Sequence, residues 1–286
     1  MCESKHSHFS IQTMMRQEID LAVEWAAAEG WNPGLHDAEC FYAADPEGFL
    51  VGKVGCESVV CISVVTYGTG FGFLGFYIVK PEFRGKGYGL SLWNAGMKRL
   101  QGRTVGLDGV VAQQENYRKS GFALAYRNVR YQGFGGNKLM PDGDIVELKT
   151  IPFNELTAYD QPFFPDDRHA FLKCWIQQKE GSALGVMDNR KLAGYGVIRR
   201  CRTGYKIGPL FADTPLYADK LFSALKATVP EEEPVFLDIP EVNPAAVELV
   251  KRHNMSVVFE TARMYTGIIP DLPVQKIFGV TTFELG

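Results

Sequence analysis

The chain has 286 residues, of which 46% are hydrophobic and 22% charged, and its formal net charge is −3. This composition is typical of a soluble globular protein, and the length predicts one large or two ordinary domains. The slightly acidic balance provides no basic field for nucleic acid, and no stretch reaches the roughly 20 apolar residues of a membrane helix. We therefore expect neither a nucleic-acid nor a membrane partner.

The N-terminal segment and the cysteines indicate the compartment. Residues 1–9 lack the apolar core of a signal peptide, so we expect a cytoplasmic protein. The cysteines show no C-x-x-C pair and no zinc-type spacing with the histidines, and we expect no metal site. Without an export signal they are expected to be reduced thiols. They are Cys2, Cys40, Cys56, Cys61, Cys174 and Cys201.

The first part of the chain alternates predicted helices and strands. A helix is predicted over residues 15–29, because Ile19, Ala22, Val23 and Ala26 share one face. The elements that follow are strands 49–54, 59–66 and 71–79, a helix 90–101, a strand 105–111, a short helix 113–119 and a strand 122–129. Gly121 has the position of a helix-ending glycine. One further early helix is left open.

A glycine-rich turn joins the predicted strand 71–79 to the predicted helix 90–101. Gly85, Gly87 and Gly89 stand at alternate positions, and Arg84 and Lys86 add positive charge. Glycines allow close backbone approach, and the N-terminus of a helix offers free N–H groups and a favourable dipole to an anion. This turn is therefore expected to hold a phosphate group.

The spacing of these glycines selects among phosphate loops. It does not match G-x-x-x-x-G-K-[ST], and G-x-G-x-x-G fails because position 90 is Leu. Arg84-x-x-Gly87-x-Gly89 resembles the R/Q-x-x-G-x-G/A motif of the GCN5-related N-acetyltransferases, whose loop cradles the pyrophosphate of acetyl-coenzyme A. A second family landmark, a Tyr four positions before Gly-Phe, corresponds to Tyr117. The resemblance covers roughly residues 9–137.

The second part of the chain repeats the pattern without this chemistry. Its predicted elements are strands 183–187, 192–199 and 205–210, a helix 216–229, a strand 235–239, a helix 243–254 and a strand 255–265. Asn243 and Pro244 are expected to begin a helix, and Asn254 to end it with positive φ. No R-x-x-G-x-G is present, and Val250 stands where the first copy has Tyr117.

Breaks at residues 133–136 and 139–143 place the expected boundary between two domains. The layout resembles tandem acetyltransferases of the YitH type, with an intact domain over residues 1–137 and a degenerate one over 138–286. The degenerate domain would cover the substrate or serve a structural role. The resemblance implies an α/β (α+β) fold, in which each domain has a mixed, mostly antiparallel central sheet flanked by helices.

The resemblance also implies which residues bind the coenzyme. The main chain of the strand at Ile78 and Val79 would pair with the pantetheine arm, and the loop would hold the pyrophosphate. The implied set is Ile78, Val79, Arg84, Gly85, Lys86, Gly87, Tyr88, Gly89 and Asn116. Asn116 is included because Val110 stands where the family usually has an Asn.

Catalytic roles follow in part from the same resemblance. Tyr117 would be the general acid that protonates the leaving thiolate, because a phenol ionises near pH 10. Two carboxylates compete for the role of general base, Asp108 in an apolar strand and Glu115 one turn from Tyr117. On the acceptor side lie Trp25, Trp31, His36 and Asp37, where the Trp residues could equally belong to the core.

These features favour an acetyl-CoA-dependent N-acyltransferase that acetylates a small-molecule amine by direct attack in a ternary complex. Two alternatives from other classes stay open. One is an acyl-CoA sensor without turnover, and the other is an interaction protein marked by an apolar patch on residues 140–286. Whether the chain forms a homodimer is also left open.

Overall fold

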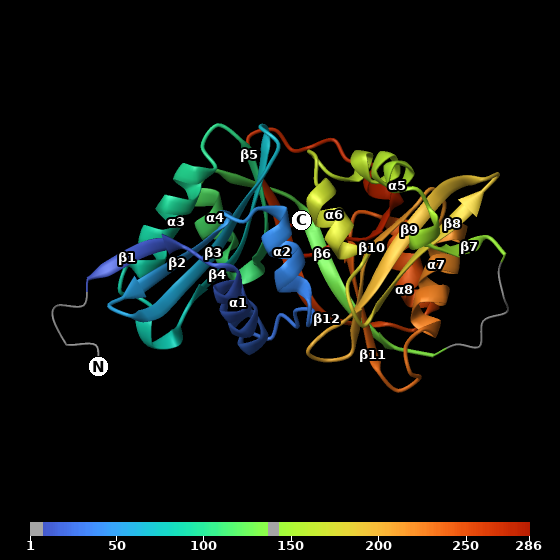
Figure 1. Cartoon of the computed structure of the whole chain (residues 1–286), viewed down its shortest axis with the longest axis horizontal. Coiled ribbons are helices and arrows are strands. Elements are labelled where there is room, and N and C mark those ends of the chain that lie inside the picture. Colours follow the sequence, from blue (N-terminus) through green and yellow to red (C-terminus); the bar gives the residue numbers. More distant parts are fainter. Residues whose placement is uncertain (1–7, 137–142) are drawn as a thin grey trace.

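The computed structural model describes residues 8–136 and 143–286, so the boundary expected between residues 137 and 138 lies outside the described residues. We call residues 8–136 the first half and residues 143–286 the second half. The described strands form one 13-stranded sheet with helices packed along both halves (Figure 1). Its order is β1-β2-β3-β4-β5-β12-β6-β11-β10-β9-β8-β7, with β13 paired to β10. The expected mixed, mostly antiparallel α/β fold is confirmed.

Both halves follow the predicted order of elements. The first half contains β1 (Phe9–Thr13), α1 (Arg16–Ala28), α2 (Asp37–Ala44), β2 (Phe49–Val54), β3 (Glu57–Tyr67), β4 (Phe71–Val79), α3 (Tyr88–Arg99), β5 (Thr104–Val110), α4 (Gln114–Lys119) and β6 (Phe122–Phe134). The second half contains β7 (Ile145–Glu147), α5 (Phe153–Asp160), α6 (His169–Trp175), β8 (Gly181–Asp188), β9 (Lys191–Arg200), β10 (Tyr205–Ala212), α7 (Pro215–Ala227), β11 (Pro234–Pro240), α8 (Pro244–Arg252), β12 (Ser256–Thr266) and β13 (Ile277–Gly279). Unpredicted elements are β1, α2, β7, α5, α6 and β13.

Several helix ends lie where local chemistry predicts them. Asn243 caps α8 by accepting hydrogen bonds from the N–H groups of Ala245 and Ala246. Gly121 after α4 has φ +89° and Asn254 after α8 has φ +54°, so both expected left-handed positions are confirmed. The strand predicted to end at residue 129 is longer, because its partner β11 pairs with it as far as Phe134.

Alternating side chains divide the first-half core between the two faces of the sheet. On β3, Val60, Ile62 and Val64 pack into one buried cluster with α3, whereas Cys61 and Val65 pack into another with α1 and α2. This is the period-two pattern of a strand buried on both faces. The sheet is thereby held rigidly at the strands that approach the glycine loop.

The two halves exchange strands at the centre of the sheet. β12 of the second half inserts between β5 and β6, and β6 of the first half lies between β12 and β11. Figure 1 shows both strands crossing between the two groups of helices. Residues of β12 consequently lie next to β5, one strand away from β4, which leads into the glycine loop.

Strands β4 and β5 are paired over only part of their length. Their parallel pairing runs from Phe71↔Thr104 to Leu74↔Leu107 and then stops. The β3–β4 register also shifts between Cys61 and Ser63, and Phe76 on β4 takes a φ of +46°. This bulge turns the end of β4 away from β5. A wedge therefore opens between the two strands beyond Leu74.

The equivalent wedge of the second half is filled. β10 and β11 pair only from Tyr205↔Val235 to Ile207↔Leu237, and β13 then pairs with β10. Val280 continues the contact by donating its N–H to the carbonyl of Asp238. Pro215 opens the following helix, and Thr214 caps it by accepting from Tyr217. Both the cleft and the free amides of the first half are lost here.

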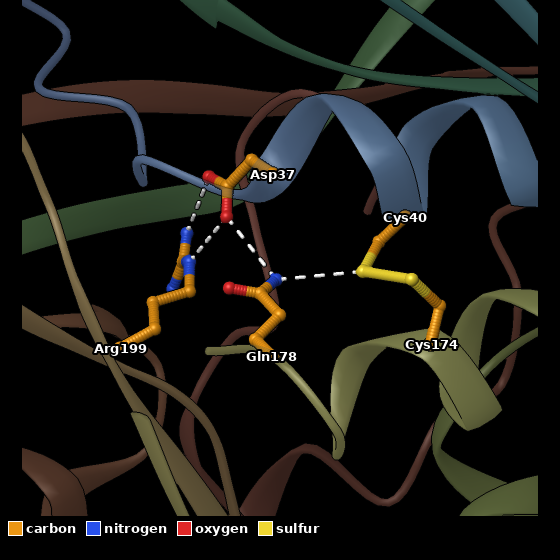
Figure 2. Close-up of a disulfide and its surroundings, with 5 residues drawn as sticks. All are labelled: Asp37, Cys40, Cys174, Gln178 and Arg199. Atoms are coloured by element: carbon orange, nitrogen blue, oxygen red, sulfur yellow. Dashed lines mark hydrogen bonds and ion pairs between the residues drawn. A yellow bond between two sulfur atoms is a disulfide. The ribbon is translucent and has the colours of Figure 1, made fainter. Parts of the chain in front are cut away.

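A buried cluster and a disulfide join α2 to the second half (Figure 2). Asp37 pairs with Arg199 through Nε at 2.8 Å, and Gln178 donates to the same carboxylate at 3.3 Å. Burial opposes ionisation of Asp37, but the charge and hydrogen bonds of Arg199, with smaller contributions from the Gly34 N–H and Lys206, together lower the pKa of the carboxyl. Cys40 and Cys174 form a disulfide, so the expectation of reduced thiols is wrong for this pair. The local spacing of cysteines carries no information on such a nonlocal approach.

Candidate active site

The loop between β4 and α3 exposes a row of main-chain amides. After the short 3-10 turn Pro81–Phe83, Gly85 and Gly87 take φ values of +75° and +83°, a conformation that favours glycine. The N–H groups of residues 85–90 find no hydrogen-bond acceptor among the described residues. Because these amides surround the positive end of the 12-residue helix α3, the loop suits a phosphate group.

The third glycine serves packing. A Cβ on Gly89 would lie 2.7 Å from the Tyr77 hydroxyl and 2.9 Å from Cγ2 of Val79, so only glycine lets α3 approach β4 this closely. Tyr88 begins the helix, and its ring stacks on Phe9 with the ring centres 4.8 Å apart. The part of Tyr88 left for an anion is therefore its main-chain N–H.

Two cations border the loop. Arg84 donates from Nε to the carbonyl of Val79 at 2.9 Å and from Nη2 to Glu29 at 2.5 Å, with its side chain about half exposed. The ammonium of Lys86 lies 5.0 Å from the ring centre of Phe83. Each can turn toward an anion on the exposed amides without crossing a packed core.

A cavity of about 660 Å³ occupies the wedge between β4 and β5. Its walls are residues 74–79 of β4 and 107–110 of β5, and α4 closes one side. The volume lies in the range of small-molecule sites, roughly 300–1,000 Å³. Arg84 and Leu90, which flank the exposed amides, also line the cavity, so the glycine loop borders it.

The strand pairing distinguishes the two residues expected to meet a pantetheine arm. Lys80 donates its N–H to Val59, and Ile78 and Val79 face Cys61 and Val60. Alternation in an antiparallel pair then directs the main-chain groups of Ile78 to β3 and those of Val79 to the cavity side, where the Val79 carbonyl already accepts from Arg84 and the N–H is left for an arm. The main-chain role expected for Ile78 does not fit this pairing, whereas that of Val79 does.

Tyr117 on α4 points its ring across the cavity wall. It stacks on Trp93 with the ring centres 5.8 Å apart and rests on Gly109, where a Cβ would lie 2.1 Å from its ring. Burial, with a smaller effect of Tyr77, raises the pKa of Tyr117 to about 12. The hydroxyl is therefore a weaker acid than the sequence-based value of 10 implied, and it stays protonated at neutral pH.

Asp108 lies in the cavity wall but is fully paired. Its carboxylate accepts from Arg263 at 3.0 and 2.5 Å and from Asn128 at 2.8 Å, and its side chain has no exposed surface. A guanidinium that binds both oxygens fixes the carboxylate in an ion pair across the strands. The expectation that Asp108 acts as the general base does not fit this geometry.

The remaining expected residues on α4 lie at or beyond the rim. Glu115 is exposed, pairs with Arg118 and does not line the cavity. Asn116 lines it and donates to Gln113 at 2.7 Å, and Lys119 also lines it. Glu115 is therefore poorly placed as a base, because the helix directs its carboxylate to solvent.

The expected acceptor-side residues separate into two groups. Trp31 lines the cavity, and its carbonyl accepts from Arg130. Trp25 packs under the ammonium of Lys80, and Asp37 is buried against Arg199. Only Trp31 of this set reaches the cavity; His36 instead pairs with Glu180 at 3.0 Å.

The second half supplies four cavity residues that sequence reasoning missed. Phe259 and Thr261 come from β12, and Phe283 and Glu284 come from the C-terminal tail. Their local sequence carries no catalytic motif. Phe259 and Thr261 reach the site because β12 inserts beside β5, and Phe283 and Glu284 reach it because the tail packs on β4.

Other classes of site are not found in the described ranges. Within residues 8–136 and 143–286, no group of three or more His, Cys, Asp or Glu residues is placed to hold a metal ion. No helix in that part of the chain is long and apolar enough to cross a membrane.

Two family profiles match separate parts of the chain. Residues 11–123 match the profile described as "Acetyltransferase (GNAT) family", and residues 156–279 match "Acetyltransferase (GNAT) domain". Holothin acyltransferase of Pseudoalteromonas sp. is 34% identical over 99% of this chain and 96% of its own length. The uncharacterised N-acetyltransferase YitH of Bacillus subtilis is 25% identical over 66% of this chain and 67% of its own length.

Solved structures show the same architecture. A candidate acetyltransferase from Pyrococcus horikoshii superposes with a TM-score of 0.83 at 24% identity, covering 99% of this chain and 98% of that one. A tandem GNAT protein from the clavulanic acid biosynthesis pathway gives 0.64 at 12% identity, covering 92% and 100%. At these identities the likeness supports the fold alone.

Proposed function

This chain belongs to the GCN5-related N-acetyltransferase (GNAT) family, and from that premise we propose that it transfers an acetyl group from acetyl-CoA to the amine of a small molecule. The main support for the proposal is that two features lie side by side in the first half. A row of unpartnered amides at the N-terminus of α3 opens directly onto the cavity between β4 and β5. The amides suit the diphosphate of coenzyme A, and the cavity suits the pantetheine arm attached to it.

Each wall of this site has a role in the proposal. The amides of residues 85–90 and the guanidinium of Arg84 hold the diphosphate, and the main chain of Val79 aligns the arm. The acyl donor supplies a thioester that is already activated toward amines. The hydroxyl of Tyr117 donates a hydrogen bond, and then a proton, to the sulfur that leaves.

Direct attack by the amine is favoured over a covalent acyl-enzyme. No cysteine lines the cavity among the described residues. Cys61, on the neighbouring strand β3, is buried and donates from Sγ to the carbonyl of Phe76 at 3.1 Å. Burial raises the pKa of its thiol far above the usual range, so a thiolate nucleophile is not available there.

The second half favours a small acceptor. Phe259, Phe283 and Trp31 border the cavity with apolar surface, and part of that surface comes from the second half. Such a cover leaves room for a compact molecule rather than a protein tail. The relative from Pseudoalteromonas is named for acylation of holothin, which also supports one defined acceptor.

Reversal of charge at Arg84 is expected to weaken binding of coenzyme A. In Arg84→Glu the Kd should rise about 10- to 100-fold, the value of a charge-assisted hydrogen bond of roughly 1.5–3 kcal/mol. Titration calorimetry with coenzyme A measures this change. Arg190→Glu, an exposed substitution in the β8–β9 turn, is the matched control and should bind as the wild type does. Equal affinity in both variants would remove Arg84 from the site.

The function is tested with acetyl-CoA and a panel of primary amines, read by release of the free thiol. We expect amine-dependent release for a subset of compact amines with an apolar body, and little release with lysine-containing peptides. Propionyl-CoA and longer donors in parallel define the acyl preference. Tight binding of coenzyme A without turnover on any amine would instead support an acyl-CoA sensor.

A further inference from the structure

The C-terminal tail, residues 280–286, is fixed at the point where β4 and β5 separate. The hydroxyl of Thr282 accepts the N–H groups of Glu284 at 3.1 Å and Leu285 at 2.9 Å. The carbonyl of Leu285 accepts from the hydroxyl of Tyr67 at 3.1 Å. A Cβ on Gly75 would lie 2.2 Å from the carbonyl oxygen of Glu284, so the tail packs directly on the first unpaired residue of β4.

Glu284 differs from every other carboxylate that lines the cavity. Glu29 pairs with Arg84, and Asp108 pairs with Arg263. Glu284 lines the same cavity and is 3% exposed, yet its carboxylate has no ion pair or hydrogen bond with any described residue. A buried carboxyl group without a partner is costly, and such groups in clefts are candidates for function.

Charged side chains of both signs surround Glu284. Burial raises the pKa of Glu284, the positive charge of Lys206 opposes the rise, and Asp37 adds to it. Lys206 itself is buried, and its ammonium donates to the carbonyl of Asn32 at 2.9 Å. The charged groups that face this region are Asp37 of α2, Arg130 of β6, Arg199 of β9, Lys206 of β10 and Asp238 of β11. With Glu284 ionised, this group contains three cations and three anions.

We propose that Glu284 is the general base that takes a proton from the acceptor ammonium, so that the second half completes the active site of the first. This inference rests on the proposed acyl transfer. It assigns the base to neither Asp108 nor Glu115. The geometry supports it because Glu284 and Tyr117 line the same cavity from different elements, one in the tail and one on α4.

The proposed proton transfers are balanced. The carboxylate of Glu284 removes one proton from R–NH₃⁺, which leaves a neutral amine with a free electron pair. A C–N bond forms to the acyl carbon, and the C–S bond breaks with its electron pair on sulfur. The sulfur takes the proton of Tyr117, which recovers one from the new amide nitrogen. Glu284 then releases its proton to water.

The test compares Glu284→Gln with the wild type on an amine found active in the panel. We expect kcat/KM at neutral pH to fall about 100-fold or more. The wild-type profile should lose activity on acidification above the ordinary range of glutamate, and this acid limb should vanish in Glu284→Gln. Affinity for coenzyme A, measured by calorimetry, should change less than threefold. Glu248→Gln on the exposed face of α8 is the matched control.

A second readout does not depend on turnover. In protein labelled with ¹³C at the glutamate carboxyl carbon, the resonance missing from Glu284→Gln identifies Glu284. We expect it to titrate at a higher pH than exposed glutamates. If Glu284→Gln does not fold, Glu284→Asp replaces it, with the shorter carboxylate expected to retain the acid limb at reduced rate.

The outcomes separate this inference from the proposed function. Amine-dependent transfer with an unchanged acid limb in Glu284→Gln would overturn the role of Glu284 and leave the acyltransferase intact. Loss of the acid limb in Glu115→Gln instead would assign the base to α4. Absence of transfer in the wild type, with normal binding of coenzyme A, would overturn the proposed function itself.

Discussion

Replacement of Tyr117 by Phe is expected to lower kcat by about 10²- to 10⁴-fold, the usual contribution of a positioned proton donor. The ring of Phe keeps the stacking on Trp93 and the contact with Gly109, so the cavity wall should keep its shape. Only the hydroxyl proposed to protonate the leaving sulfur is lost. KM for the acyl donor and the Kd of coenzyme A should therefore change little.

The role of Tyr117 also predicts how activity depends on pH. Tyr117 must be protonated to act as a donor, and burial raises its pKa to about 12. Activity that depends on its proton is present at lower pH and is lost only as pH rises through that value. We expect no alkaline limb from Tyr117 below pH ~10. Tyr217→Phe on α7 is the control; equal rates for Tyr117→Phe and wild type would exclude the general-acid role.

Replacement of Asp108 by Asn is expected to destabilise the fold rather than remove a base. Asp108 on β5 and Arg263 on β12 form a buried cross-strand ion pair at the point where the halves exchange strands. Asn would leave the guanidinium buried without a counterion, at a cost of about 3–5 kcal/mol. Burial opposes the charge of Arg263, but Asp108 together with Tyr265 and Tyr126 holds the pKa of the guanidinium well above its usual value.

Chemical denaturation measures the loss of unfolding free energy. The paired substitution Asp108→Leu with Arg263→Met removes both charges and should recover most of the stability, because well-packed apolar residues often replace a buried ion pair without loss. Unchanged stability in Asp108→Asn together with abolished turnover would return Asp108 to the list of bases.

The glycine loop could be predicted from sequence because its determinants are local. Positive φ at Gly85 and Gly87, close packing at Gly89 and the N-terminus of α3 all follow from adjacent residues. Tyr117 could be placed for the same reason, since family spacing fixes it relative to Gly121. The early helix left open corresponds to α2, whose eight residues are too few to show helical periodicity.

The nonlocal features could not be predicted from local patterns. The strand over residues 255–265 was predicted, but its insertion between β5 and β6 depends on partners that its own alternation does not specify. The Cys40–Cys174 disulfide joins residues 134 positions apart. Glu284 reaches the cavity only because β13 and the tail pack against β10 and β4. The pairing of Asp108 with Arg263, 155 positions further along the chain, was likewise not visible from the local sequence.

The C-terminal segment explains why the wedge between β10 and β11 of the second half is filled. β13 occupies the wedge between β10 and β11 that corresponds to the cavity of the first half. The tail that follows contributes Phe283 and Glu284 to the cavity of the first half. One segment therefore closes one cleft and lines the other.

A crystal structure with bound coenzyme A tests the central claim most directly. We predict that the diphosphate lies on the amides of residues 85–90 at the N-terminus of α3, with the arm between β4 and β5. Coenzyme A bound between β10 and β11, or a complex in which those amides make no contact with the diphosphate, would contradict the account.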